Sequence, residues 1–229
     1  MLSKRNLIPL SPLIRFFLAA LLPALMLACN EVKEKDPVPV PEKMDVRVQK
    51  DIRQLLDFSN DNKGRLNDTI ALLQDSLMTS LYAGREYKSL WCSNEAWTAA
   101  ADSLFNFIQN AKSCGLFPLD YHSKALQGHR LQLQDSMTRS DAMFWSRGDL
   151  MMTDAFLQLV HDLKAGRLPS DSISSRNDSI WTASYYDSLL QVALEPGRIN
   201  GLLNDLQPRI PLYVGLKSAL QRFVDSLSP

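Results

Sequence analysis

The stretch that most constrains how this chain can fold runs from Ser140 to Ile173. Apolar side chains recur in it at steps of three and four residues, which places them on one face of a helix. They are Ala142, Trp145, Met152, Phe156, Leu159 and Leu163. Ser140 is a suitable N-cap, Gly166 is a stop signal and Pro169 blocks continuation, so we predict a helix over about residues 141–165. At 1.5 Å per residue it is about 37 Å long, enough to cross a domain.

The same helix is apolar on more than one side, because Leu150, Met151 and Val160 lie away from the main stripe. Such a helix normally packs on several sides, so we expect it to be central. Helical spacing of apolar residues also occurs over residues 48–56, 70–81, 97–111, 131–137, 180–194 and 212–227, with a short helix starting near Tyr121. No repeat of fixed length connects these segments. The sequence predicts an all-α fold, an irregular multi-helix scaffold around the central helix, with at most minor short strands, one of them near residues 85–92.

Four polar residues of the central helix have two interpretations. Asp149 and Thr153 lie on or near its apolar face, and His161 and Asp162 follow further along. They could be buried polar groups whose hydrogen bonds are satisfied by neighbours. They could also form an acid and base set, but no third group at a recognisable spacing completes such a site. The structural interpretation is therefore preferred, and we expect no catalytic residue here.

The N-terminus carries a targeting signal. Lys4 and Arg5 precede an apolar run over residues 16–28, which is too short for a comfortable membrane span and ends at Cys29. The string LMLAC resembles a bacterial lipobox, and this resemblance implies cleavage before Cys29 and attachment of lipid to its thiol. An uncleaved anchor or an N-terminal core helix is the alternative. We expect a signal peptide over residues 1–28 and a location in the cell envelope, lipid-anchored and facing the periplasm.

Composition indicates how the rest of the chain is divided and which partners its charge favours. Residues 29–43 are charged and then proline-rich, which is typical of a flexible tether, and residues 44–229 have room for one folded domain. The chain has 25 basic and 25 acidic residues and no basic stripe, so a nucleic-acid partner is not expected.

Motifs for known chemistries are missing from the sequence. It contains no HExxH, no glycine-rich phosphate loop, no GxSxG and no CxxC. Cys92 and Cys114 could be nucleophiles only beside a positioned base, could pair as a disulfide, or could simply pack in the core, which is the commonest case. The histidines His122, His129 and His161 are scattered, so we expect neither a metal site nor a cofactor.

Aromatic residues give the remaining candidates for a contact surface. Trp91, Tyr185 and Tyr186 could contact a glycan or a partner protein through their amphipathic rings. Tryptophan at helical spacing is more often a core residue. Tyr185 and Tyr186 are adjacent, so both cannot point inward, and one of them is the better candidate.

Four separated pieces of the chain carry a family resemblance. In order they are SLYAGREYKSLWC, EAWTAAADSLFNFIQNAKSCGLFPLDYH, DLMMTDAFLQLVHDLKAGRLP and LQPRIPLYVGLKSALQRF. Together, over roughly Leu81 to Phe223, they resemble the N-terminal scaffold region of large periplasmic L,D-transpeptidases, which cross-link peptidoglycan. Matching positions are Tyr82, Trp91, Gly115, Asp120, Tyr121, Asp149, Thr153, Asp162, Gly166, Arg167 and Tyr213. The resemblance implies a mainly helical scaffold that packs on a catalytic domain.

The chain departs from that family at the catalytic motif. Catalysis there resembles cysteine acyl transfer from an SxGCxR motif, whereas here Ser93 follows Cys92 and Gly115 follows Cys114. We therefore expect a non-catalytic scaffold part of a cell-wall L,D-transpeptidase lipoprotein, truncated or split before the catalytic domain. Its expected partners are peptidoglycan or a transpeptidase catalytic domain, and the membrane through its lipid. The alternatives are a stand-alone helical lipoprotein that binds peptidoglycan or a partner cell-wall enzyme, and an enzyme using Cys92 or Cys114.

Overall fold

The computed structural model describes residues 42–167 and 181–227, and in this part of the chain the all-α prediction is confirmed. These residues belong to a compact unit that spans Glu42–Pro229. Its helices are α2 (Met44–Asp61), α3 (Asp75–Ala83), α4 (Ala99–Gln109), η1 (Ala111–Cys114), η2 (Pro118–Tyr121), α5 (Ser123–Gln132), α6 (Ser136–Arg139), α7 (Ala142–Ala165), α8 (Ala183–Leu194), α9 (Ile199–Asp205) and α10 (Pro211–Leu227). A two-stranded antiparallel sheet pairs β1 (Cys92–Ser93) with β2 (Ala96–Trp97).

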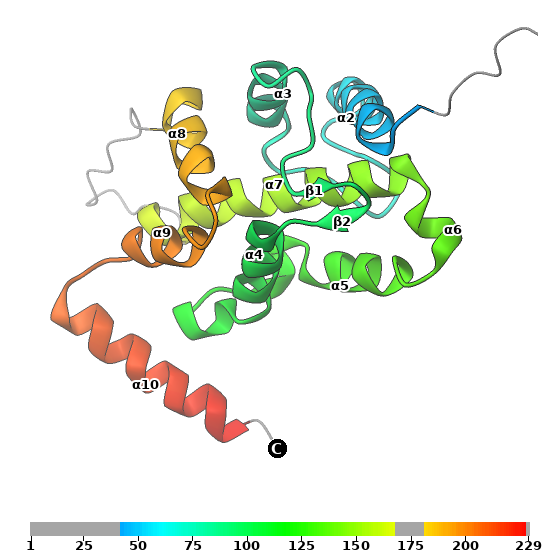
Figure 1. The fold of residues 1–229 in the computed structure, drawn as a ribbon. Helices are drawn as coiled ribbons and strands as arrows, with labels where there is room; N and C mark the ends of the chain where they lie inside the picture. Colours follow the sequence, from blue (N-terminus) through cyan, green and yellow to red (C-terminus); the bar gives the residue numbers. More distant parts are fainter. Residues whose placement is uncertain (1–41, 168–180, 228–229) are drawn as a thin grey trace, which may run out of the picture. The chain divides into compact units, whose positions relative to one another are not determined.

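The central helix predicted over about residues 141–165 is α7. Figure 1 shows α7 in the middle of the unit, with α2, α3 and α8 on one side and α4 and α5 on the other. Its most extensive packing is with α2. The predicted N-cap Ser140 is wrong, because the Asp141 side chain caps the helix by accepting from the Met143 amide at 3.0 Å. Gly166 ends the helix with a φ of 83°, a conformation that favours glycine.

Burial of apolar side chains on every side of α7 explains why it is central. Leu150, Ala155, Phe156, Leu157 and Leu159 are each fully buried, although they point to different neighbours. Burying a large apolar side chain contributes about 1.5–3 kcal/mol, so this one helix anchors much of the core. The neighbouring helices are amphipathic and bury a single face, as α2 does with Val48, Ile52, Leu55 and Leu56.

Local hydrogen bonds explain why several predicted helix boundaries were wrong. α3 starts at Asp75, because the Asn67 side chain accepts from the amides of Thr69 and Ile70 and holds that segment in a turn. α4 starts after its N-cap Thr98, since the two residues before it pair in the small sheet.

The segments on either side of α7 also differ from the prediction. The helix expected over residues 131–137 is interrupted: α5 ends at Gln132, and α6 starts after Asp135, whose side chain caps it. The short helix α9 was not predicted from the sequence. None of the helices within residues 42–167 and 181–227 is long and apolar enough to cross a bilayer.

Candidate functional site

A buried polar network is centred on Asp149 of α7. Its buried carboxylate accepts hydrogen bonds from Tyr82 Oη at 2.6 Å, Ser89 Oγ at 2.5 Å and the Trp91 amide at 2.7 Å. The Leu90 amide donates as well, at 3.1 Å to each oxygen. Burial raises the pKa of Asp149, while the donors oppose that shift by stabilising the carboxylate. The carboxylate therefore fastens the loop between α3 and β1 to the central helix.

Thr153, one turn further along α7, completes this network. Its Oγ1 lies 2.6 Å from Tyr82 Oη and accepts from the Trp91 indole Nε1 at 2.9 Å. Burial and the neighbouring Asp149 charge raise the pKa of Tyr82, so its hydroxyl keeps its proton. Every member is satisfied by a neighbour, which is the structural interpretation of Asp149 and Thr153 made from the sequence.

Two more buried carboxylates of α7 fasten other segments to it. Asp154 accepts from the amides of Leu73 and Gln74 at 2.9 and 2.8 Å, at the start of α3, and lies 2.7 Å from His122 Nε2. Asp162 accepts from Tyr121 Oη at 2.8 Å.

Asp162 has two further neighbours on α7 itself. Gln158 Nε2 donates to Asp162 Oδ1 at 3.0 Å, and His161 Nδ1 lies 3.1 Å from the same oxygen. The sequence-predicted pair of His161 and Asp162 is thus in contact. Asp149, however, is hydrogen-bonded to a different set of residues, so the four polar positions do not form one acid and base set.

The cysteines also lack the surroundings of a nucleophile. Cys92 and Cys114 are both free thiols, so the disulfide alternative is wrong for this structure. Burial, followed by the Asp149 charge, raises the pKa of the Cys92 thiol far above its ordinary value. Its hydrogen-bonding neighbour is Ser89 at 3.0 Å, and no histidine is hydrogen-bonded to either thiol within the described residues. Nor does this part of the chain contain three or more His, Cys, Asp or Glu side chains grouped to hold a metal ion.

The aromatic candidates differ in how deeply they are buried. Trp91 is fully buried and packs against Phe156, with ring centroids 5.9 Å apart and ring planes inclined by 54°. Because it is buried, it is not a surface contact. Tyr186 is buried too, and burial raises its pKa to about 12. Tyr185 is half-buried at the edge of the cluster that it forms with Trp181 and Tyr186. Cys29, the candidate lipidation site, lies outside the described residues.

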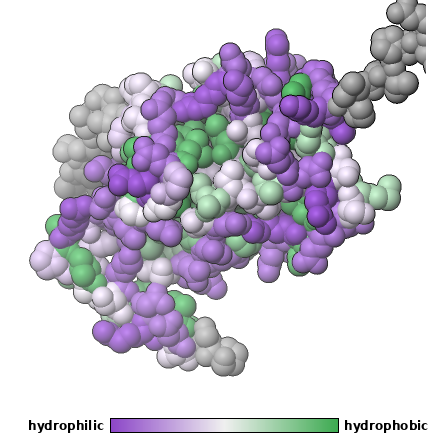
Figure 2. Space-filling model, in the orientation of Figure 1, coloured by the Kyte–Doolittle hydropathy of each residue, from purple (hydrophilic) through white to green (hydrophobic). Residues whose placement is uncertain are grey.

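An exposed apolar face lies on α10. Leu212, Leu216, Ala219, Phe223 and Leu227 fall on one face of this helix, and all five are exposed. Leu216 is 62% exposed and Phe223 is 60% exposed. We call these five residues the α10 stripe. Figure 2 shows apolar patches among the hydrophilic surface of this helix.

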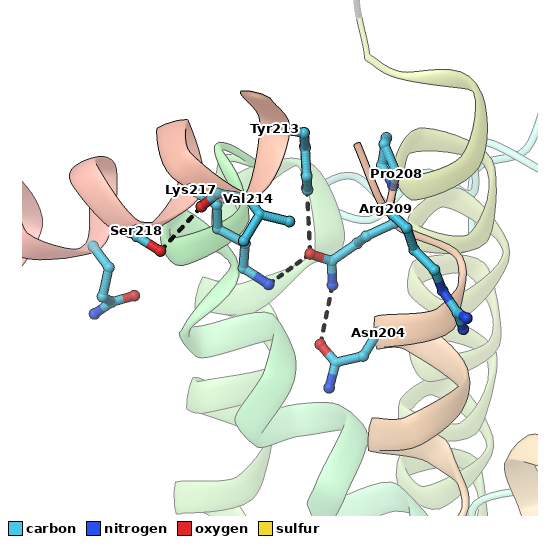
Figure 3. A pocket seen from close by; sticks show the side chains of 9 residues that line it. Asn204, Pro208, Arg209, Tyr213, Val214, Lys217 and Ser218 are labelled. Carbon is cyan, nitrogen blue, oxygen red and sulfur yellow. Dashed lines mark hydrogen bonds between the residues drawn. The ribbon is translucent and has the colours of Figure 1, made fainter. Parts of the chain in front are cut away.

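A neighbouring face of α10 is held against the rest of the unit. Half-buried Tyr213, Lys217 and Leu220 lie on it, and α10 packs mainly on η1. At the α9–α10 turn, Gln207 Oε1 accepts from Lys217 Nζ at 2.6 Å and from Tyr213 Oη at 3.3 Å, as Figure 3 shows. Gln207 Nε2 donates to Asn204 Oδ1 at 3.1 Å. Gln207, Tyr213 and Lys217 border a cavity of about 550 Å³, and their hydrogen bonds tie the first turns of α10 to the α9–α10 turn.

These features define a helical scaffold: a central helix with satisfied buried carboxylates, and one amphipathic helix with an exposed apolar face. A protein-family model described as "Scaffold domain" matches residues 76–220, from the first turn of α3 into α10. The match covers more than half of the chain, so the chain belongs to the Scaffold domain family. No curated protein and no solved structure matches the chain.

Proposed function

We propose that this chain is the non-catalytic scaffold part of a cell-wall L,D-transpeptidase lipoprotein, and that it holds a transpeptidase catalytic domain against peptidoglycan. The observation that carries the proposal is the match to the Scaffold domain family over residues 76–220, together with the α10 stripe. A scaffold needs a rigid body and a surface for its partner. The hydrogen bonds of the buried α7 carboxylates make the body rigid, and the α10 stripe is suited to be the partner surface.

The α10 stripe has the chemistry of a protein-binding surface. Exposed apolar groups gathered on one face commonly mark interaction sites, and an amphipathic helix can fill an apolar groove with side chains spaced by three and four residues. Leu212, Leu216 and Phe223 have that spacing and lie on one face. We propose that the catalytic domain covers this face.

Binding between the full-length chain and a separately produced L,D-transpeptidase catalytic domain tests the proposal. Replacing Leu216 or Phe223 by Asp places a charge in the proposed contact, and we expect each to weaken binding at least about tenfold. Met137→Asp is the matched control, because Met137 is 83% exposed on α6 and not on α10. Equal losses in all three variants, or no binding by the wild type, would refute the docking role of α10.

The lipid anchor is tested separately at Cys29. We expect Cys29→Ser to move the protein from the membrane fraction to the soluble fraction, since no thiol remains for acylation. A mutant that still sediments with membranes contradicts the lipoprotein proposal. Co-sedimentation with purified sacculi in the absence of a catalytic domain would favour a stand-alone peptidoglycan-binding lipoprotein instead.

A further inference from the structure

A cleft unrelated to the α10 stripe lies among the segment before α3, η2, α5 and α7. Its volume of about 710 Å³ is within the range of small-ligand sites, about 300–1,000 Å³. Its lining contains no Asp or Glu, whereas Arg147 of α7 and Lys124 of α5 bring two positive charges to it. Ile70, Leu119, Phe144 and Met151 supply apolar lining. The cleft is thus suited to a ligand with a negative group and an apolar part.

Arg147 is the first unusual group in this cleft. Within the described residues its guanidinium forms neither an ion pair nor a hydrogen bond, and its Nε is shielded from solvent without an acceptor. Other partly buried arginines are paired: Arg85 with Asp187, and Arg130 with Asp102. A shielded donor is normally satisfied, so Arg147 has the chemistry of a group that binds an acceptor from outside the chain.

His129 is the second unusual group, and it needs a donor. Its Nε2 lies 2.7 Å from the Phe144 carbonyl oxygen, and because that oxygen can only accept, Nε2 carries the ring proton. Burial lowers the pKa of His129 to about 4, so the ring is neutral near pH 7 and Nδ1 is a bare acceptor. Nδ1 is shielded from solvent and has no donor in the part of the chain that the structure describes.

The His129 ring is fixed in this position. It stacks on Phe144 with centroids 3.9 Å apart, and it packs so closely on Gly148 that a Cβ there would lie 2.6 Å from Cε1. The nearby carboxylate of Asp154 is not part of the cleft lining. It already accepts hydrogen bonds from two backbone amides and lies beside His122 Nε2. Two residues that line the cleft, Arg147 and His129, thus carry an unpaired donor and an unpaired acceptor.

We infer that this cleft binds the carboxylate end of a short peptide. The carboxylate pairs with Arg147, assisted by Lys124; a peptide N–H donates to His129 Nδ1; and the terminal side chain packs on Leu119 and Phe144. Inorganic phosphate offers the negative charge without the apolar part, so it is the weaker ligand. The inference uses residues of η2, α5 and α7 and does not depend on the partner proposed for α10.

Calorimetric titration of the full-length protein with N-acetyl-Ala-Ala-Leu and with its C-terminal amide tests this site. We expect the acid to bind at least about tenfold more tightly than the amide, because only the acid can form a charge-assisted pair. Arg147→Gln should reduce the affinity for the acid to that for the amide. Arg139→Gln is the matched control, since this exposed arginine of α6 is outside the cleft, and it should leave binding unchanged.

A second readout is made on the wild type, and a variant serves only to assign its signal. The Arg147 Nε–H resonance of the wild type, assigned with Arg147→Lys, should shift when the acid is added and not when the amide is added. A peptide ending in a D-amino acid serves as a further ligand: tighter binding than the all-L peptide indicates a cell-wall peptide as the source, and weaker binding indicates a protein C-terminus. Equal affinities for acid and amide, equal losses in the two arginine variants, or an unmoved Arg147 resonance overturn the inference.

Discussion

The helices α7 and α10 are both long and both carry apolar stripes in the sequence, but the structure uses them in opposite ways. Most residues of α7 are buried, including Asp149, Asp154 and Asp162, whereas none of the residues of α10, all of which the structure describes, is buried. The main stripe alone does not separate the two cases, whereas the additional apolar residues of α7, Leu150, Met151 and Val160, indicate packing on several sides. The difference lies in what surrounds each helix: α7 has neighbours on both sides, and α10 packs mainly on η1.

This comparison explains where polar groups contribute to stability. On α7 each buried carboxylate collects donors from a loop or helix far away in the sequence, so the loss of one leaves several donors unsatisfied. On α10 the half-buried Tyr213 and Lys217 both donate to one acceptor, Gln207 Oε1, and water can reach these two donors if that acceptor is lost. Stability therefore depends on α7, and we expect α10 to contribute mainly to binding.

The largest expected effect is that of Asp149→Ala. It leaves the buried amides of Leu90 and Trp91 without an acceptor, and each buried unsatisfied donor costs about 1–3 kcal/mol. The hydroxyls of Tyr82 and Ser89 also lose their bonds to the carboxylate, although Thr153 and the Cys92 carbonyl remain as their partners. We expect a loss of at least about 4 kcal/mol in the free energy of unfolding, measured by urea denaturation. The control Asp45→Ala removes a carboxylate that bonds exposed Ser93 and Asn94 and should cost less than about 1 kcal/mol. Similar losses in both variants would contradict the central role of the α7 network.

A slightly smaller effect is expected for Phe156→Ala on α7. Phe156 is fully buried against Trp91, and truncating such a side chain leaves a cavity, so we expect a loss of about 3–5 kcal/mol. The urea midpoint should fall while the slope of the transition stays constant. A loss below about 1 kcal/mol would show that α7 is not the centre of the core.

The fold could be predicted well where the local sequence determines the structure. The apolar spacing of α7 and its Gly166 stop signal gave its extent to within one residue at the start. Boundaries set by side-chain hydrogen bonds were missed, because Asp141, Thr98 and Asn67 act through local geometry that several nearby polar residues could have adopted. The seven-residue α9 offers too few turns for a periodic signal.

The candidate sites were less predictable than the fold. Burial of Trp91 follows from its place between α3 and β1, which helical spacing does not reveal. Asp149 and Thr153 could be singled out because polar residues on an apolar face are unusual, but their partners Tyr82 and Ser89 are about 60 or more residues away. The cleft containing Arg147 and His129 was missed, since it forms only when α5 packs on α7.

The pH dependence of stability tests a buried group beside α7. The pKa of His129 is lowered to about 4 in the folded protein, so the unfolded chain, with the ordinary value of 6.5, binds the proton more tightly. The contribution of the neutral His129 ring to the free energy of unfolding is complete above about pH 6.5 and is lost as the pH falls towards 4. We expect a loss of about 2 kcal/mol between pH 7 and pH 5, measured as the difference in unfolding free energy between wild type and His129→Gln. Identical pH profiles for the two proteins would contradict the assignment of a neutral, buried ring.

The smallest expected effect is that of Phe223→Ala on α10, and it is the sharpest test of the comparison with Phe156. The same side chain is truncated, but Phe223 is 60% exposed, so no cavity forms and we expect a change within about 0.5 kcal/mol in urea denaturation. A loss above about 2 kcal/mol would mean that the α10 stripe is already covered in solution. Dependence of that loss on protein concentration would then identify a second copy of the chain as the cover, whereas independence would place the cover within the chain.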